Sequence, residues 1–323
     1  MYFKIIETMI VLLLISLFNN STCQTKDTGK EQIIEIGTFN IEWFPCKDDG
    51  GMMKQYGINL RYPPKGESTN MKALFGLLGN LDIELLALEE IVDPQMFADS
   101  AQKYLGRQYK FIYSPAGGDQ KVGFLYDSTA LQLIGKPETY MQVALSNDSR
   151  LRPAFGVYFK AVPSGFDFHA IVVHLKASPR GWDLRKKQWT ILEEILTNLP
   201  KETNDSDIVL LGDFNNVSKL RTAEFDTIMQ RTGFYRATKE LSEMVSNYWQ
   251  PDYKKERIEG SLIDHIFISA DAKIEFIENS LKVGGMCAEG ALEYRGDSIP
   301  DYYQQISDHC PVYGSFRVDI DND

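Results

Sequence analysis

The sequence lacks any apolar run long enough to cross a bilayer, and it lacks an excess of positive charge. Its longest apolar stretch, Met9 to Phe18, has ten residues, whereas a membrane-spanning helix needs about 20. Acidic residues outnumber basic ones by 45 to 34, which gives a formal net charge of -11 at pH 7. An acidic chain gains no long-range attraction toward a polyanion. The sequence therefore offers no transmembrane helix, and any recognition of phosphate must be local or carried by a bound cation.

The N-terminal segment has the order of a signal peptide. Lys4 precedes the apolar stretch, and small polar residues follow it up to Cys23. We therefore expect a signal peptide over residues 1–23, a polar linker over 24–31 and an exported protein, secreted or periplasmic. Cys23 could instead be the lipid-modified first residue of a bacterial lipoprotein, and a buried N-terminal helix is the structural alternative.

Cysteine is also scarce, with four in 323 residues. Cys46, Cys287 and Cys310 would remain after cleavage, and their spacing matches no metal-binding motif. Disulfides form in the oxidising compartments that exported proteins reach. One bridge with a free thiol and three buried thiols both stay open.

The hydrophobic content of 43% is ample for a large core, and the chain shows no internal repeat or low-complexity run. Short apolar runs and period-two alternation predict strands, and helical spacing predicts two helices, near residues 71–81 and 189–199. A surface excursion is expected over residues 45–70, which are rich in glycine, proline and charge. The strands are expected at residues 33–39, 83–88, 109–113, 122–126, 131–135, 155–161, 166–173, 207–211, 263–269, 272–276 and 311–318. Because strands outnumber helices without a regular βαβ rhythm, an α+β layered sandwich is favoured over a doubly wound sheet.

The segment LLGDFNN is the most informative stretch, because Asp213 and Asn215 directly follow an apolar run. Gly212 is expected to break the strand, so that both side chains project the same way from its C-terminal tip. A carboxylate beside a carboxamide suits a hydrated hard cation and a phosphate oxygen. A turn that caps a helix is the ordinary structural alternative.

Further polar clusters also end apolar runs. Taken singly, each has a structural explanation as a helix start, a buried histidine or a turn cap. Their common position at strand ends favours a shared site. These clusters are Asn40 with Glu42, Glu89 with Glu90, His174, and Asp264 with Asp308 and His309.

The set TFNIEW, LALEEI, HLKAS, LLGDFNN, LIDHIFIS and ISDHCPV resembles the endonuclease/exonuclease/phosphatase superfamily. The superfamily includes pancreatic deoxyribonuclease, abasic-site endonucleases, sphingomyelinases and inositol polyphosphate phosphatases. The resemblance runs from about Ile33 to Val318, so we expect one such domain over residues 32–319 and a tail over 320–323. It implies a four-layer α/β/β/α sandwich of two mixed sheets flanked by helices, with the active site at one end.

The resemblance also implies the residues of catalysis. Asp213 and Asn215 match the pair that orients the attacking water and holds the phosphate. His309 matches the catalytic histidine and Asp264 the acid that orients it. His174 resembles a second histidine found in the deoxyribonuclease and sphingomyelinase branches.

Metal and phosphate ligands follow in the same way. Glu90 matches the principal metal-binding glutamate, with Glu42 and Asp308 on the metal side of the site. Phosphate binding is implied for Asn40, Asn215, His174 and Arg152, although Arg150 lies close enough to compete with Arg152.

These residues imply a metal-dependent phosphodiesterase that uses Mg²⁺, with Mn²⁺ or Ca²⁺ as alternatives. Diester cleavage needs a nucleophilic water, neutralised phosphoryl oxygens and a stabilised leaving oxygen, which this set can supply. A nuclease that cuts DNA or RNA with little sequence preference is expected, with nucleic acid as substrate and no stable protein partner. The alternatives are a sphingomyelinase-like enzyme that acts on a phospholipid head group, another small-molecule phosphoesterase, or an inactive binding module.

The chain departs from parts of the pattern. Gln120 stands where pancreatic deoxyribonuclease has the glutamate that orients the second histidine; it can bond an imidazole but cannot stabilise an imidazolium as a carboxylate does. The inositol phosphatase signatures are absent, and abasic-site endonucleases lack a histidine at position 174.

Two basic or aromatic stretches could hold substrate, namely residues 176–187 and 248–257. Arg185 to Lys187 have the alternative interpretation of a solvated helix face. The nearest candidate for a membrane-contacting hairpin is Met286 to Tyr303. Asn216 has the form of a glycosylation acceptor and is interpreted as unmodified.

Overall fold

Twelve strands form two six-stranded sheets, and a third sheet adds three short strands. The computed structural model describes residues 32–46, 68–145, 151–203, 205–251 and 256–321. The expected signal peptide and linker lie outside the described residues, as does most of the expected surface excursion.

The first sheet has the strand order β13-β15-β1-β2-β4-β3. β1 and β2 are parallel, and all other neighbouring pairs are antiparallel. Its strands are β1 (Ile33–Phe44), β2 (Leu85–Ile91), β3 (Tyr109–Tyr113), β4 (Lys121–Asp127), β13 (Lys282–Val283) and β15 (Val312–Arg317).

The second sheet has the order β5-β6-β7-β8-β12-β9, with β7 and β8 as its parallel pair. Its strands are β5 (Leu131–Tyr140), β6 (Ala154–Ala161), β7 (Asp167–His174), β8 (Ile208–Asp213), β9 (Tyr235–Arg236) and β12 (Asp264–Ile268). The small antiparallel sheet contains β10 (Asn247–Trp249), β11 (Arg257–Ser261) and β14 (Glu293–Arg295).

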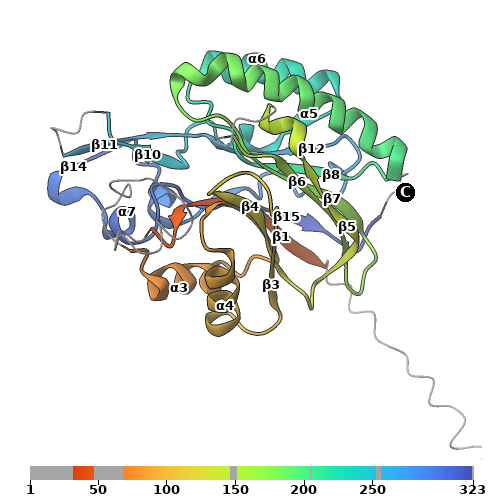
Figure 1. The fold of residues 1–323 in the computed structure, drawn as a ribbon, viewed down its shortest axis with the longest axis horizontal. Helices are drawn as coiled ribbons and strands as arrows, with labels where there is room; N and C mark the ends of the chain where they lie inside the picture. The colour runs from red at the N-terminus through yellow and green to blue at the C-terminus, as the bar shows by residue number, and fades with distance from the viewer. Residues whose placement is uncertain (1–31, 47–67, 146–150, 204, 252–255, 322–323) are drawn as a thin grey trace, which may run out of the picture. The chain divides into compact units, whose positions relative to one another are not determined.

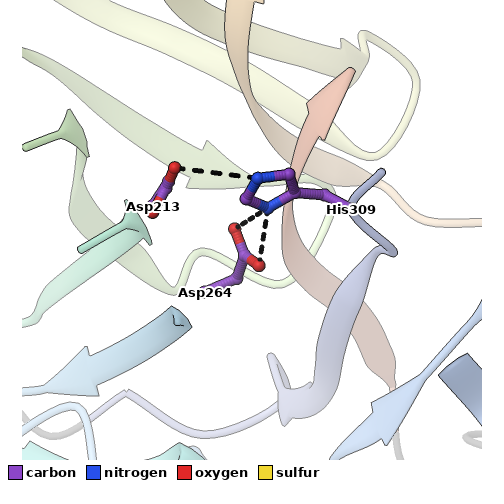
Figure 2. Close-up of side chains that lie close together, drawn as sticks. All are labelled: Asp213, Asp264 and His309. Atoms are coloured by element: carbon purple, nitrogen blue, oxygen red, sulfur yellow. Dashed lines mark hydrogen bonds and ion pairs between the residues drawn. The ribbon is translucent and has the colours of Figure 1, made fainter. Parts of the chain in front are cut away.

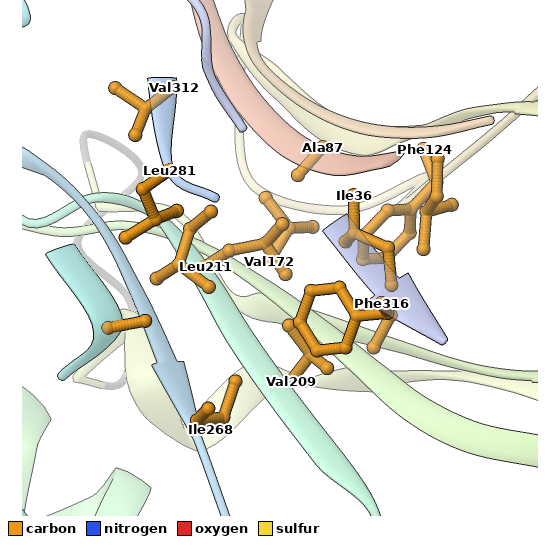
Figure 3. Close-up of a cluster of buried hydrophobic side chains, with 14 of the residues drawn as sticks. Ile36, Ala87, Phe124, Val172, Val209, Leu211, Ile268, Leu281, Val312 and Phe316 are labelled. Carbon is orange, nitrogen blue, oxygen red and sulfur yellow. The ribbon is translucent and has the colours of Figure 1, made fainter. Parts of the chain in front are cut away.

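The largest hydrophobic cluster lies between the two six-stranded sheets. Ile36 and Phe124 enter it from the first sheet, and Val172, Val209 and Leu211 enter it from the second (Figure 3). Full burial of such a side chain contributes about 1.5–3 kcal/mol. Successive residues of a strand point to opposite faces of the sheet. The residues next to these in each strand therefore belong to the two hydrophobic clusters on the outer faces of the sheets.

Helices cover both outer faces (Figure 1). α3 (Met71–Leu81) and α4 (Pro94–Tyr104) pack on the first sheet, where Leu74, Phe75 and Phe97 are buried. α5 (Trp182–Thr203) and α6 (Lys219–Arg231) cover the second sheet through residues that include Trp189 and Phe225. The expected four-layer α/β/β/α sandwich is therefore confirmed. The short elements are α7 (Asp301–Gln305), η1 (Met141–Ala144), η2 (Pro179–Gly181), η3 (Ala237–Leu241), η4 (Gly285–Glu289) and η5 (Gly296–Ser298).

Two strand predictions are corrected. Residues 272–275 form turns, and only Phe276 makes an isolated bridge, to Phe316. Gly212 does not end its strand, because β8 continues to Asp213. Gly212 has φ 141° and lies so close to β7 that a Cβ atom would stand 2.0 Å from the Val173 carbonyl oxygen. Only glycine accommodates this approach.

The strand ends bring separate motifs together. Asp213 pairs in register with His174 on β7 and with Asp264 on β12. On the first sheet, Asn40 pairs with Glu89. Among the helices of the described residues, none is long and apolar enough to span a bilayer.

Candidate active site

The Asp213 carboxylate lies at the centre of the polar cluster and is 2% exposed. Its Oδ2 accepts hydrogen bonds from the side-chain amides of Asn215 at 2.9 Å and Asn40 at 3.3 Å. Its Oδ1 accepts the Asn215 backbone N–H at 2.8 Å. The Asn215 amide also donates to the Leu175 carbonyl at 3.2 Å. Both N–H bonds of the Asn215 amide are thus engaged, and this residue positions Asp213 directly.

Two imidazoles face the same carboxylate. His174 Nε2 lies 3.5 Å and His309 Nε2 lies 3.9 Å from Asp213 Oδ2. Both distances exceed those of good hydrogen bonds, so the two imidazole nitrogens face Asp213 Oδ2 without bonding it directly. Burial raises the pKa of Asp213, and the charges of Asp264 and Glu90 raise it further against the opposing charge of His309.

His309 and Asp264 form a buried hydrogen-bonded pair (Figure 2). His309 Nδ1 lies 2.9 Å from Oδ2 and 3.1 Å from Oδ1 of Asp264. Ser246 Oγ donates to Asp264 Oδ2 at 2.6 Å and accepts the Asp264 backbone N–H at 3.1 Å. An anionic carboxylate at Nδ1 fixes the proton there, which turns Nε2 toward Asp213.

A serine anchors the backbone of this histidine. Ser307 Oγ accepts the His309 N–H at 3.0 Å and donates to the Asn40 carbonyl at 2.8 Å. Burial on its own lowers the pKa of His309, but the carboxylates of Asp264 and Asp308 outweigh it and raise this pKa well above its ordinary value.

A second carboxylate group lies on the first sheet. Glu42 Oε2 accepts the Asp308 N–H at 3.1 Å, and Glu90 Oε2 accepts the Trp43 N–H at 3.1 Å. Glu42, Trp43 and Glu90 all have positive φ, at 48°, 55° and 62°. Such conformations cost about 1–3 kcal/mol each and persist where surrounding contacts hold them. Here the strained backbone turns the carboxylates toward the cluster.

His174 lies between the two groups. Its Nε2 is 3.6 Å from Glu90 Oε1, while its buried Nδ1 has no hydrogen-bond partner among the described residues. Gln120 is buried but does not bond this imidazole. Burial and the charge of Arg152 lower the pKa of His174 well below its ordinary value, so the ring is neutral. For Glu90, burial and the charge of Asp308 raise the pKa, and Arg152 opposes this.

These groups form the floor of a cleft of about 470 Å³. Its walls include the segment 177–179, Val217 and Trp249, and the last two are each 46% exposed. A polar floor with exposed apolar walls suits a ligand that combines a charged group with a planar or apolar part.

The sequence model of the endonuclease/exonuclease/phosphatase family matches residues 37–309. The chain belongs to this family. The matched segment contains every candidate site residue. No curated protein matches the chain.

Solved structures of the endonuclease/exonuclease/phosphatase fold are also similar. A family protein from Bacteroides thetaiotaomicron is 15% identical, with a TM-score of 0.58 and coverage of 90% of this chain and 100% of that one. TDP2 from D. rerio, complexed with single strand DNA product, is 15% identical, with a TM-score of 0.60 and coverage of 89% and 100%. A mannosyl-6-phosphatase from Bacteroides thetaiotaomicron is 16% identical, with a TM-score of 0.53 and coverage of 87% and 98%. At these identities the likeness establishes the fold.

Family members hydrolyse phosphate esters and use divalent metal ions, and the residues of this chain fit such an ion. One ligand atom each from Asp213, Asp264 and His309 lies within 4.8 Å of the others. A cation there would have to displace the hydrogen bond between Asp264 and His309. The carboxylates of Glu90 and Asp308 repel one another, and a hard cation bound by oxygen ligands would relieve that repulsion.

The structure brings all the sequence-predicted site residues into this one region: Asn40, Glu42, Glu90, Arg152, His174, Asp213, Asn215, Asp264, Asp308 and His309. Sequence reasoning missed Ser246 and Ser307, which fix Asp264 and His309. Ser307 directly precedes Asp308 and His309 in the motif, which was a usable signal, whereas nothing marked Ser246.

Glu89 had been assigned no role. Its side chain is fully buried, with Oε1 accepting the Thr38 hydroxyl at 2.8 Å. Burial and the charge of Asp264 raise the pKa of Glu89 well above its ordinary value.

Several expectations about the substrate-binding stretches are corrected. Arg185 is 1% exposed, so it is not part of a solvated helix face. Tyr248 is fully buried and cannot stack on a base, unlike its neighbour Trp249. Tyr253 to Lys255 lie outside the described residues.

The candidate membrane hairpin and the glycosylation motif both lie within the described residues, and Leu292 in the hairpin segment is 67% exposed. In the segment 286–303, Met286 is 7% exposed, and β14 pairs with β11. Asn216 is 2% exposed and donates to Thr222 Oγ1. Cys287 and Cys310 form a disulfide, and Cys46 is a buried cysteine outside that bridge.

Proposed function

We propose that this protein is a divalent-metal-dependent phosphodiesterase, specifically a nuclease that cleaves DNA or RNA with little sequence preference. The observation that carries the proposal is the His309–Asp264 pair on the cleft floor. Asp264 holds His309 Nδ1, and His309 Nε2 faces the buried Asp213 carboxylate.

The side chains divide the chemistry between them. Asp213, held by Asn215 and Asn40, orients the attacking water from its Oδ2. His309 Nε2, fixed through Nδ1, contacts a phosphoryl oxygen when protonated or, as general base, takes the proton of the attacking water. His174, as a neutral donor, contacts the phosphate from the other side.

The remaining charges complete the site. Arg152 lies close enough to Glu90 and Asp213 to influence the Glu90 pKa, and it supplies a positive charge for the phosphate. Glu90, with Glu42 and Asp308, would hold the cation, and a bound Mg²⁺ supplies charge neutralisation on the phosphoryl oxygens.

Nucleic acid is the substrate that the cleft supports best. The exposed ring of Trp249 lies beside the catalytic floor, and aromatic stacking suits every base. The DNA product in the similar TDP2 structure agrees with this substrate class. The phospholipid alternative has less support, because Met286 and the disulfide fix the start of the candidate hairpin in the core and leave Leu292 as its one largely exposed aliphatic residue among the exposed large hydrophobic residues of the described chain.

We further propose that residues 1–23 direct export, to a secreted or periplasmic protein or one anchored through Cys23. The Cys287–Cys310 disulfide supports this, because disulfides persist in oxidising compartments. Mass spectrometry of the mature N-terminus tests it, and a retained Met1 would contradict it.

The test of activity uses protein lacking residues 1–23, supercoiled plasmid and single-stranded RNA, with and without EDTA. His309→Ala should abolish cleavage. His169→Ala is the matched control, because His169 is another buried histidine at the opposite end of β7. Cleavage that is insensitive to EDTA or to His309→Ala would refute the proposal. No polymer cleavage, with metal-dependent turnover of bis(p-nitrophenyl) phosphate, would refute the nuclease assignment and retain the phosphodiesterase.

A further inference from the structure

A second, smaller pocket adjoins the catalytic cleft. It has a volume of about 200 Å³ and shares Pro179 and Val217 with the cleft as lining residues. Its other lining residues are Arg185, Asn216, Ser218 and Arg221. We call it the basic pocket, because both of its charged residues are arginines.

Arg185 brings a buried positive charge to the basic pocket. Its Nη1 donates to the carbonyl oxygens of Lys176 at 2.6 Å and Ser178 at 2.8 Å, while its buried Nε has no acceptor. No carboxylate in the described part of the chain forms an ion pair with it. Burial and the charge of Arg221 lower the pKa of Arg185 to about 10, so it stays protonated at neutral pH. A buried cation without an anion is costly, and a bound anion would offset this cost.

Arg221 adds a second, accessible guanidinium. Its Nη1 lies 3.3 Å from the Pro179 carbonyl, and the group lies 4.9 Å from the Trp182 ring centre. No carboxylate of the described residues pairs with Arg221 either. Two guanidinium groups without acidic partners thus meet beside the cleft of a protein whose net charge is -11.

The first turn of α6 opens on the same pocket. Ser218 occupies the N-cap, but no side chain caps this turn. The N–H groups of a first helical turn lack acceptors within the helix, and the helix dipole favours an anion there.

We propose that the basic pocket binds a second phosphate group of the substrate, next to the one that is cleaved. Guanidinium groups and helical N–H groups are the usual partners of phosphate oxygens. The preferred substrate is then a chain of phosphodiesters, as in a polynucleotide, and not an isolated diester such as a phospholipid head group. This inference rests on the proposed phosphodiesterase function.

Arg221 is the residue to change. Arg185 also holds the carbonyls of the segment that follows His174, so its loss would disturb the catalytic floor. Arg221 is partly exposed; its guanidinium donates to the Pro179 carbonyl and lies over the Trp182 ring. Arg231, exposed at the other end of α6, is the matched control with the same charge change on the same helix.

The experiment compares kcat/KM for thymidine dinucleotides with no terminal phosphate, a 5′-phosphate or a 3′-phosphate. The unmodified protein should prefer one phosphorylated form by about 10- to 150-fold, the range for a hydrogen bond to a charged group. Arg221→Ala should reduce this ratio to near one, whereas Arg231→Ala should retain it. With single-stranded DNA, Arg221→Ala should also reduce the salt slope of log KM by roughly 0.7.

Two results would overturn the inference: no preference for either terminal phosphate, or equal ratios in Arg221→Ala and Arg231→Ala. If Arg221→Ala does not fold, as judged by thermal melting, Arg221→Gln replaces it with the same criteria. Failure of the proposed function is distinct, because the unmodified protein would then also fail to hydrolyse bis(p-nitrophenyl) phosphate in the presence of Mg²⁺ or Mn²⁺.

Discussion

Replacement of Asp264 by asparagine tests whether the buried pair with His309 drives catalysis. The substitution preserves the size of the side chain and removes its charge. Asparagine can still accept the Ser246 hydroxyl and the His309 Nδ1–H through an oxygen at the Oδ2 position, but its NH₂ group would replace the second oxygen, 3.1 Å from the same nitrogen. Loss of the Asp264 charge would lower the pKa of His309, so the ring would tend to lose the proton that faces Asp213.

The size of the effect follows from the contacts. His309 Nδ1 lies 2.9 and 3.1 Å from the two oxygens of a fully buried carboxylate. A hydrogen bond to a charged group contributes about 1.5–3 kcal/mol, which alone is about 10- to 150-fold in rate. The lowered pKa of His309 also removes a charged donor at Nε2, so we expect kcat to fall by about 10²- to 10⁴-fold.

Turnover of bis(p-nitrophenyl) phosphate, with thermal melting to confirm folding, measures this loss. Ser246→Ala is the companion variant, because it removes a support of Asp264 and retains the carboxylate at His309. We expect it to lose less activity than Asp264→Asn. The reasoning is refuted if Asp264→Asn retains activity within about threefold of the unmodified protein while His309→Ala is inactive. A threefold loss is smaller than the loss of one charged hydrogen bond would cause.

Three further predictions concern the cleft wall, acid stability and the disulfide. Trp249→Ala should raise KM for single-stranded DNA by about 5- to 150-fold, because stacking contributes about 1–3 kcal/mol per base; an equal effect of Leu292→Ala, at another exposed apolar residue, would contradict this. Burial lowers the pKa of His169 to about 4, against about 6.5 when unfolded. The unfolded chain therefore binds more protons, and about 3 kcal/mol of stability, complete above pH 6.5, should be lost as the pH falls toward 4. His169→Asn should flatten this dependence in urea melts, and an unchanged profile would show that His169 does not contribute. Replacement of both Cys287 and Cys310 by alanine should lower the unfolding free energy by about 3 kcal/mol, from the entropy of a loop with a sequence separation of 23; equal denaturant midpoints would refute it.

The strands and their ends were predictable because apolar runs mark them directly. Asp213, His174 and Asp264 follow or begin such runs, and neighbouring strands place them in register. The start of α4 was also marked, since Asp93 caps the helix and Pro94 occupies its first turn, but this signal was overlooked.

Other features depend on contacts that no local pattern encodes. The segment 272–276 alternates like a strand, yet turns replace it because only Phe276 meets a partner. Ser246 bonds Asp264 across 18 residues of sequence, and its segment carries no motif. Arg185 has the spacing of a solvated helix face, and it is buried because two carbonyls of the catalytic segment accept its guanidinium.

The site spans the seam between the two six-stranded sheets. Asn40 on β1 donates across this seam to Asp213 on β8, and Ser307 ties the backbone before β15 to β1. An incompletely folded chain therefore carries every reactive side chain but no reactive centre, whichever sheet forms first. The site is complete only when both six-stranded sheets have docked. The proposed substrate is nucleic acid, so the absence of an assembled site before folding is complete would protect the cell that synthesises the protein.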